Sequence, residues 1–135
     1  MPDLATDVEM DVIVSALREK FVESAGAKLD LIDQALDGIG TETMLADSHS
    51  SKIKRQVHSL KGTAGSFGFM SITLIAEAFE EFLSAAELNG TVSASDAHLY
   101  FAAIRTIIDS GVEPGEDERA RIMNALPAPA QSNAG

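Results

Sequence analysis

Apolar residues recur along the chain at steps of three and four, the spacing that places side chains on one face of an α-helix. The first such segment opens with Thr6-Asp7-Val8-Glu9, a capping-box pattern typical of a helix start. Gly38 and Gly40 are expected to end it. A single helix of this length is unusual, so a break near Met10–Asp11, giving a short extra N-terminal helix, is an open alternative. The apolar stripe of this segment is Ile13, Leu17, Phe21, Ala25, Leu29, Ile32 and Leu36.

The same spacing predicts four more helices, at about 47–64, 71–88, 93–111 and 116–126. Gly65 and Gly68 stop or bend the first of these, Asn89-Gly90 ends the second, and Gly111 closes the third. Four amphipathic helices with short connections predict an all-α fold, an antiparallel up-down four-helix bundle with a short C-terminal helix. The expected inward residues are Ile53, Val57, Leu60, Ala64, Leu74, Ile75, Ala78, Phe79, Phe82, Leu83, Leu99, Ala103, Ile104, Ile107 and Ile108.

The length of 135 residues suits one domain with one core, which we expect over residues 1–126. Residues 127–135 offer nothing to bury and are expected to form a disordered tail. The chain has no cysteine, which excludes a disulfide framework, a thiolate metal site and a cysteine nucleophile. No apolar run is long enough to cross a bilayer, and the acidic start lacks the basic region of a signal peptide. We therefore expect a cytoplasmic protein that does not enter the membrane.

The net charge of −11 disfavours nucleic acid as a partner, because a polyanion repels an anionic protein that has no basic patch reserved for it. The charge is unevenly distributed, since no acidic residue lies between Asp47 and Glu77. Such an interval can receive an anion such as a phosphate or dock on an acidic partner, or it can be a solvated helix face with chance clustering. Both interpretations remain open. The basic residues of this interval are Lys52, Lys54, Arg55 and Lys61.

The second predicted helix presents a histidine on its outer face. At roughly 100° per residue, His58 lies about 130° and Gly62 about 170° from the middle of the apolar arc of this helix. Lys54, Lys61 and Gly65 flank the histidine on the same side. The alternative interpretations are that His58 is an ordinary surface histidine and that the glycines allow helices to pack closely.

These residue types suit phosphoryl chemistry. An exposed imidazole is mostly neutral at pH 7 and offers a free ring nitrogen as a nucleophile. Lys61, one turn along, can neutralise the oxygens of a phosphoryl group on that nitrogen. A glycine inside a helix costs roughly 0.5–1 kcal/mol relative to alanine, so Gly62 indicates a need for open space beside the ring.

The string Val57-His58-Ser59-Leu60-Lys61-Gly62, followed by Gly68, resembles the motif of the histidine phosphotransfer (HPt) domain of bacterial and eukaryotic phosphorelays. That motif is His-x-Leu-Lys-Gly with a further glycine ten residues after the histidine, and every position matches. The next helix, around Ile75–Phe82, is also similar to that of the family. The resemblance covers the central half of the chain.

The resemblance implies that His58 is phosphorylated, that Lys61 lies beside the phosphate, and that Gly62 admits the partner. It implies a carrier, not an enzyme, which takes a phosphoryl group from the aspartate of one receiver domain and passes it to another. The partners are then receiver domains of response regulators and hybrid histidine kinases, and Mg²⁺ belongs to the acidic pocket of the receiver, so no cofactor is expected in this chain. With no glycine-rich ATP-binding boxes expected, a self-contained shuttle is favoured over a kinase fragment. The candidate docking residues are Lys54, Gly62, Gly65 and Gly68.

One alternative function remains, a non-catalytic helical adaptor that docks on a receiver or kinase without carrying phosphate. Phe67, Phe69 and Met70 could supply an apolar docking surface or lie in the core. A metal site is not expected, because His49 and His58 share no helical face and no carboxylate is expected near His58. His98 and the pair Glu80-Glu81 are interpreted as solvated surface residues.

Overall fold

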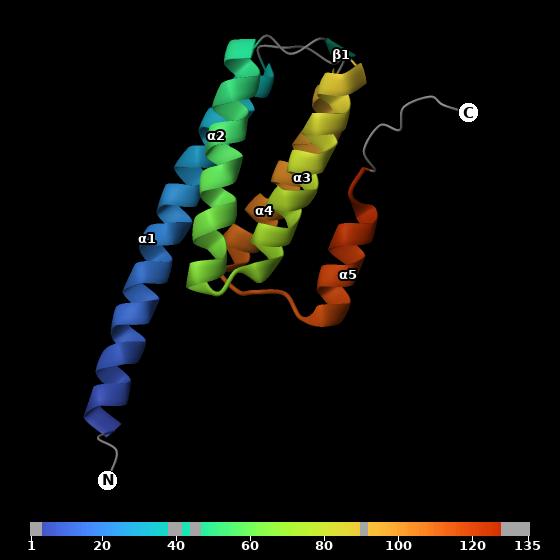
Figure 1. Ribbon diagram of the computed structural model, residues 1–135. Coiled ribbons are helices and arrows are strands. Elements are labelled where there is room, and N and C mark those ends of the chain that lie inside the picture. The colour runs from blue at the N-terminus through green and yellow to red at the C-terminus, as the bar shows by residue number, and fades with distance from the viewer. Residues whose placement is uncertain (1–3, 38–41, 44–46, 90–91, 128–135) are drawn as a thin grey trace.

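The computed structural model describes residues 4–37, 42–43, 47–89 and 92–127. The fold is helical, with one small two-stranded antiparallel ladder in which Glu42 pairs with Ser93 and Thr43 pairs with Val92. The elements, shown in Figure 1, are α1 (Leu4–Asp37), β1 (Glu42–Thr43), α2 (Asp47–Ala64), the 3-10 helix η1 (Gly65–Phe67), α3 (Met70–Asn89), β2 (Val92–Ser93), α4 (Ala94–Ser110) and α5 (Glu116–Ala125).

Helices α1 to α4 form the predicted up-down bundle. Each of α1 and α3 packs against both α2 and α4, and successive helices run in opposite directions (Figure 1). The short helix α5 folds back beside the bundle, and Ile122, Met123 and Leu126 pack partly buried against the core. No helix within the described ranges has the length and apolar character needed to span a membrane.

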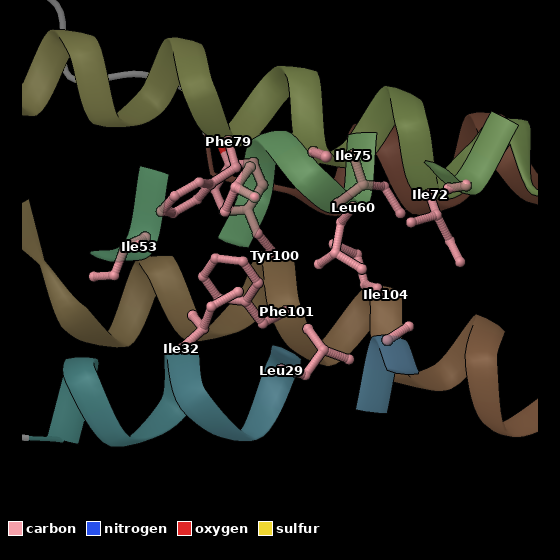
Figure 2. Close-up of a cluster of buried hydrophobic side chains, with 14 of the residues drawn as sticks. Leu29, Ile32, Ile53, Leu60, Ile72, Ile75, Phe79, Tyr100, Phe101 and Ile104 are labelled. Atoms are coloured by element: carbon pink, nitrogen blue, oxygen red, sulfur yellow. The ribbon is translucent and has the colours of Figure 1, made fainter. Parts of the chain in front are cut away.

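The core follows the predicted inward stripes. Aromatic side chains of α3 and α4 lie at its centre, where Phe79 packs 4.6 Å from Phe101 and 5.5 Å from Tyr100 between ring centroids (Figure 2). Leu99 is an exception, because 51% of it is exposed. Leu74, Ala78 and Ala103 are only partly buried. The remaining inward residues predicted for α2, α3 and α4 are buried.

Helix α1 differs from the expectation at its N-terminal end. It is continuous from Leu4, ahead of the expected cap at Thr6, and has no break near Met10–Asp11, so there is no separate short N-terminal helix in the described residues. Ile13 and Leu17 are 51% and 45% exposed, although the stripe predicted them to be buried. This end of α1 projects beyond the other helices (Figure 1), and among the side chains that the structure describes the first buried one on α1 is Phe21.

The helix ends described by the structure have local causes. Ser93 caps α4 by accepting a hydrogen bond from the Asp96 amide at 3.2 Å, and Gly111 ends α4 with a left-handed φ of 70°. At the start of α3, the amide of Ser71 donates to Glu113 Oε1 at 2.9 Å, and the Ser71 hydroxyl donates to the other oxygen of that carboxylate. The glycines expected to end α1 and α3, residues 38, 40 and 90, lie outside the described residues.

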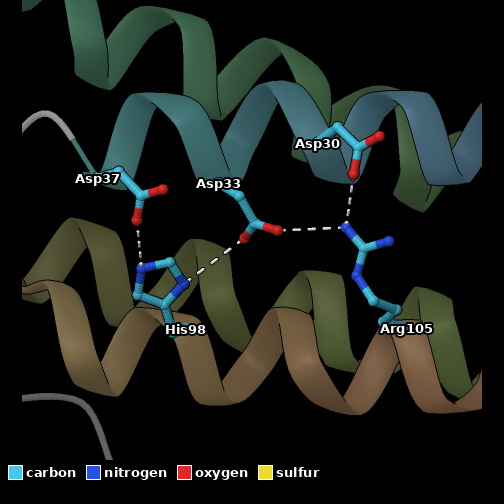
Figure 3. Close-up of polar contacts among 5 residues, drawn as sticks. All are labelled: Asp30, Asp33, Asp37, His98 and Arg105. Atoms are coloured by element: carbon cyan, nitrogen blue, oxygen red, sulfur yellow. Dashed lines mark hydrogen bonds and ion pairs between the residues drawn. The ribbon is translucent and has the colours of Figure 1, made fainter.

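The acidic residues near the end of α1 bind α4. Arg105 contacts Asp30 at 3.1 Å and Asp33 at 3.2 Å, and His98 lies 3.5 Å from both Asp33 and Asp37 (Figure 3). His98 is therefore a half-buried bridge between α1 and α4, and its interpretation as a solvated surface residue is wrong. The tail predicted from residue 127 lies outside the described residues except for Pro127, whose carbonyl accepts a hydrogen bond from the Tyr100 hydroxyl.

Candidate functional site

His58 lies on the outer face of α2. Its side chain is 76% exposed, whereas Val57 and Leu60 on the opposite face are at most 1% exposed. The wheel geometry that predicted an outward imidazole is therefore confirmed. Its role as the phosphorylated residue stays a prediction.

Gly62 leaves open space one turn from this histidine. A Cβ atom built at Gly62 would meet no atom within 4 Å, so close helix packing does not require a glycine there. At Gly65 a Cβ would lie 3.4 Å from Thr73 Oγ1, an ordinary contact distance. The packing alternative thus fails for Gly62, and its missing side chain exposes the helix backbone beside the ring.

A carboxylate that the sequence did not predict lies beside the histidine. Glu80 of α3 places Oε2 3.9 Å from His58 Nδ1, and its Oε1 is 2.5 Å from the Lys61 ammonium. The expectation that no carboxylate lies near His58 is wrong, and so is the interpretation of Glu80 as a merely solvated residue. The acid-free interval is acid-free only along the chain, because α3 packs its own acids against α2.

Lys61 is held by this contact. Its hydrogen bond to Glu80 raises its pKa above the ordinary 10.5, and the charges of Glu80 and Glu77 act in the same direction, against an opposing effect of desolvation. Lys61 therefore remains an ammonium group at neutral pH. Its positive charge is available to an incoming phosphoryl group only in competition with Glu80.

Lys54 is paired in the same way. Its ammonium lies 2.7 Å from Glu87 Oε1, with 50% of the lysine side chain exposed. Lys54 and Lys61 are seven residues apart on α2, and Glu80 and Glu87 are seven apart on α3. Because α2 and α3 are antiparallel, a step of seven residues along one helix is matched by a step of seven back along the other, so both lysines meet a glutamate. This matched spacing is the signal in the sequence that could have identified Glu80.

The turn after α2 is built by Gly68 and by two aromatic residues. Gly68 adopts a left-handed φ of 86° and ends η1, which agrees with the prediction that Gly65 and Gly68 stop or bend the helix. Phe69 is buried in the core, and Phe67 is partly buried against it and stacks on Phe21 with ring centroids 5.3 Å apart. Of the three apolar docking candidates Met70, 48% exposed, is the most accessible to a partner. A docking role for Gly68 remains a prediction.

Metal binding has no support in the side chains that the structure describes, where no group of three or more His, Cys, Asp or Glu residues could hold an ion. The side chain of His49 lies outside those residues.

The chain is an up-down helical bundle that presents an exposed histidine next to a lysine and an open glycine. A family model described as the Hpt domain matches residues 16–110, more than two thirds of the chain. The chain belongs to the Hpt domain family, whose members are phosphocarrier modules of phosphorelays and not catalytic enzymes. Comparison with curated proteins gave no significant match, and neither did comparison with solved structures.

Proposed function

We propose that this protein accepts a phosphoryl group on His58 from the aspartate of one receiver domain and passes it to the aspartate of another. The observation that carries the proposal is the exposed imidazole of His58, 76% accessible, beside the open space at Gly62. A receiver must bring its acidic pocket up to the ring, and a side chain at position 62 would stand in its path. Membership in the Hpt domain family supports the same chemistry.

The position of Glu80 favours one ring nitrogen as the nucleophile. The Nδ1 side of the His58 ring faces the Glu80 carboxylate at 3.9 Å, which favours a proton on Nδ1 and a lone pair on Nε2. In the forward step an Nε2–P bond forms, the acyl P–O bond of the phosphoaspartate breaks, and the carboxylate remains on the receiver. The ring gains positive character as the bond forms, and the nearby carboxylate stabilises it. The second transfer reverses these steps.

Lys61 supplies charge to the phosphoryl oxygens. Transfer of this kind depends mainly on positioning and on neutralising charge. The ammonium already sits one turn from His58 on the same helix, and Glu80 holds it there at 2.5 Å. Magnesium is assigned to the acidic pocket of the receiver. The cytoplasmic location expected from the sequence remains part of the proposal.

The test is a profile of phosphotransfer from phosphorylated receiver domains encoded in the same genome. Wild type should gain an acid-labile, alkali-stable label, and His58→Gln should gain none while still binding the receiver. His98→Gln is the matched control, because it removes a histidine of the same chain whose ion-pair partners among the described residues are Asp33 and Asp37, away from His58. The carrier function fails if wild type takes no label from any receiver.

The alternative adaptor would give a different result. It would bind a receiver with similar affinity whether or not residue 58 is a histidine, and it would take no label. The engagement of Lys61 by Glu80 is the one observation that favours it, because a paired lysine is a weaker phosphate ligand than a free one.

A further inference from the structure

The four basic residues of α2 divide into two pairs with different surroundings. Lys54 and Lys61 face α3, where Glu87 and Glu80 neutralise them at 2.7 Å and 2.5 Å. Lys52 and Arg55 are both exposed, and neither forms an ion pair with any acidic side chain that the structure describes. Among the side chains that the structure describes, the basic residues of α2 without an acidic partner therefore lie on one side of the helix.

The acids of the neighbouring helix do not neutralise this side. Asp30, Asp33 and Asp37 of α1 face α4, where they hold Arg105 and His98 (Figure 3). Asp30, Asp33 and Asp37 of α1, like Glu80 and Glu87 of α3, are thus paired with cations outside this side of α2. What remains is a local excess of positive charge between α1 and α2.

These two cations line a groove. It has a volume of about 390 Å³, lies between α1 and α2, and includes no acidic residue among its lining side chains. Its α1 wall is partly apolar, with Leu31 52% exposed. The lining residues are Leu31, Gln34, Ala35, Lys52, Arg55 and Gln56. Two cations, two amides and an apolar wall are complementary to a protein segment that carries both carboxylates and apolar side chains.

The groove adjoins the proposed phosphoryl site. Arg55 precedes His58 by three residues on α2, so the two side chains are neighbours on the helix surface, with about 5–6 Å between Cβ atoms in such a pair. A protein that places an aspartate on His58 must therefore cover or skirt Arg55. Because a groove of this charge attracts anions over a Debye length of about 8–10 Å, it would also orient an acidic partner during approach.

We infer that the groove between α1 and α2 is a docking site for an acidic, partly apolar segment of the receiver domain, adjacent to the pocket that contains the reacting aspartate. This inference rests on the proposed function and deepens it, since it names the contact that selects the partner. Lys52 and Arg55 act on association, whereas His58 and Lys61 act on the phosphoryl group.

The test compares two double charge reversals. Lys52→Glu/Arg55→Glu alters the groove, and Arg119→Glu/Arg121→Glu on α5 makes the same change in net charge at a partly buried and an exposed position that do not line the groove. Each variant is titrated calorimetrically with the receiver domain that labels or binds wild type best. Each is also assayed for transfer from that phosphorylated receiver and for uptake from phosphoramidate, a small donor that needs no docking surface.

We expect the groove variant to bind the receiver at least roughly tenfold more weakly and to accept its phosphoryl group at least roughly tenfold more slowly. The affinity should depend less on salt than that of wild type, and the reaction with phosphoramidate should be unchanged. The α5 variant should match wild type in all three assays. Reversal of one acidic residue of the receiver to lysine should restore part of the binding to the groove variant, as a double-mutant cycle would reveal.

The inference is overturned if both variants lose binding equally, which would indicate net charge alone, or if the groove variant binds like wild type. It is also overturned if inorganic phosphate or nucleic acid occupies the groove at lower concentration than the receiver does. Failure of the proposed function is distinguishable, because wild type would then take no label from any phosphorylated receiver while the calorimetric comparison still tests the groove.

Discussion

Glu80 of α3 joins Lys61 at 2.5 Å and lies 3.9 Å from Nδ1 of His58. One carboxylate therefore contacts the cation and faces the nucleophile of the candidate site. Since Lys61 and His58 are on α2, the arrangement of the site depends on how α2 and α3 are packed. A change in that packing would alter the site without altering its motif.

The Lys61–Glu80 contact should stabilise the fold in a pH-dependent way. The folded protein holds the pKa of Lys61 above 10.5, so the contribution is complete below that pH and is lost as the pH rises through the folded value. A double-mutant cycle with Lys61→Met and Glu80→Gln, measured by urea unfolding, should show favourable coupling at pH 7 and none well above the titration of Lys61. Glu81→Gln, an equal charge change at an exposed neighbour, should show no coupling to Lys61. Coupling that persists unchanged at high pH would contradict this account.

Gly62 should be dispensable for stability and essential for access. Because its Cβ would meet nothing within 4 Å, Gly62→Ala should stabilise the protein by about 0.5–1 kcal/mol through helix propensity alone. Gly26→Ala on α1, where a Cβ also meets nothing, is the matched control and should stabilise to a similar extent. Urea unfolding measures both changes.

A long side chain at the same position should separate access from stability. Gly62→Gln should abolish transfer from a receiver to His58 while the helix content, followed by circular dichroism, stays near that of wild type. Loss of the fold in this variant would instead assign Gly62 to packing.

The spans of the helices were predictable because their signals are local. The start of α4 at Ser93 and its end at Gly111 depend on neighbours within a few residues, and both lie where the sequence predicted the ends of this helix. The outward position of His58 followed from helical periodicity for the same reason. How much of a stripe is buried was not predictable in this way. Leu17 and Phe21 are equivalent in the pattern, but only Phe21 lies where the other helices are long enough to cover it.

The carboxylate at the site was missed because it depends on contacts between helices. Glu80 is twenty-two residues from His58 in the chain, and only the register of the α2–α3 hairpin brings them together. The same applies to His98, because its contacts with Asp33 and Asp37 of α1 depend on the packing of α1 against α4 and not on its neighbours in the chain. Charge counted along a chain therefore describes a bundle surface poorly, since each face combines residues from two helices.

Gly68 and Gly111 provide a controlled comparison of backbone strain. Both have a left-handed φ, of 86° and 70°, so replacement by alanine should destabilise each site by about 1–2 kcal/mol. At Gly68 the new Cβ would also lie 2.8 Å from Arg18 Nη2, whereas at Gly111 it meets nothing within 4 Å. Displacing Arg18 removes its hydrogen bond to the Phe67 carbonyl, which should add about 0.5–1.5 kcal/mol to the effect of Gly68→Ala.

The excess at Gly68 should disappear when Arg18 is absent. In an Arg18→Ala background, Gly68→Ala and Gly111→Ala should destabilise the protein equally in urea unfolding. If they already do so in wild type, Arg18 shifts without losing its bond and the added contribution is refuted.

Tyr100 reports directly on the core, because it is the only tyrosine of the chain and the chain has no tryptophan. Burial raises its pKa above 10.0, with smaller contributions in the same direction from Asp96 and Glu81. Titration followed by tyrosinate absorbance should therefore give a native midpoint above 10.0 that returns to the ordinary value in urea. Because the folded pKa exceeds the unfolded one, stability should fall as the pH rises from about 10 through the folded value.

Tyr100→Phe should make that fall shallower and, by losing the hydrogen bond to Pro127, lower stability at pH 7 by about 1 kcal/mol. A native midpoint at or below 10.0 would mean that the hydroxyl is solvated and that the contact with Pro127 does not persist in solution.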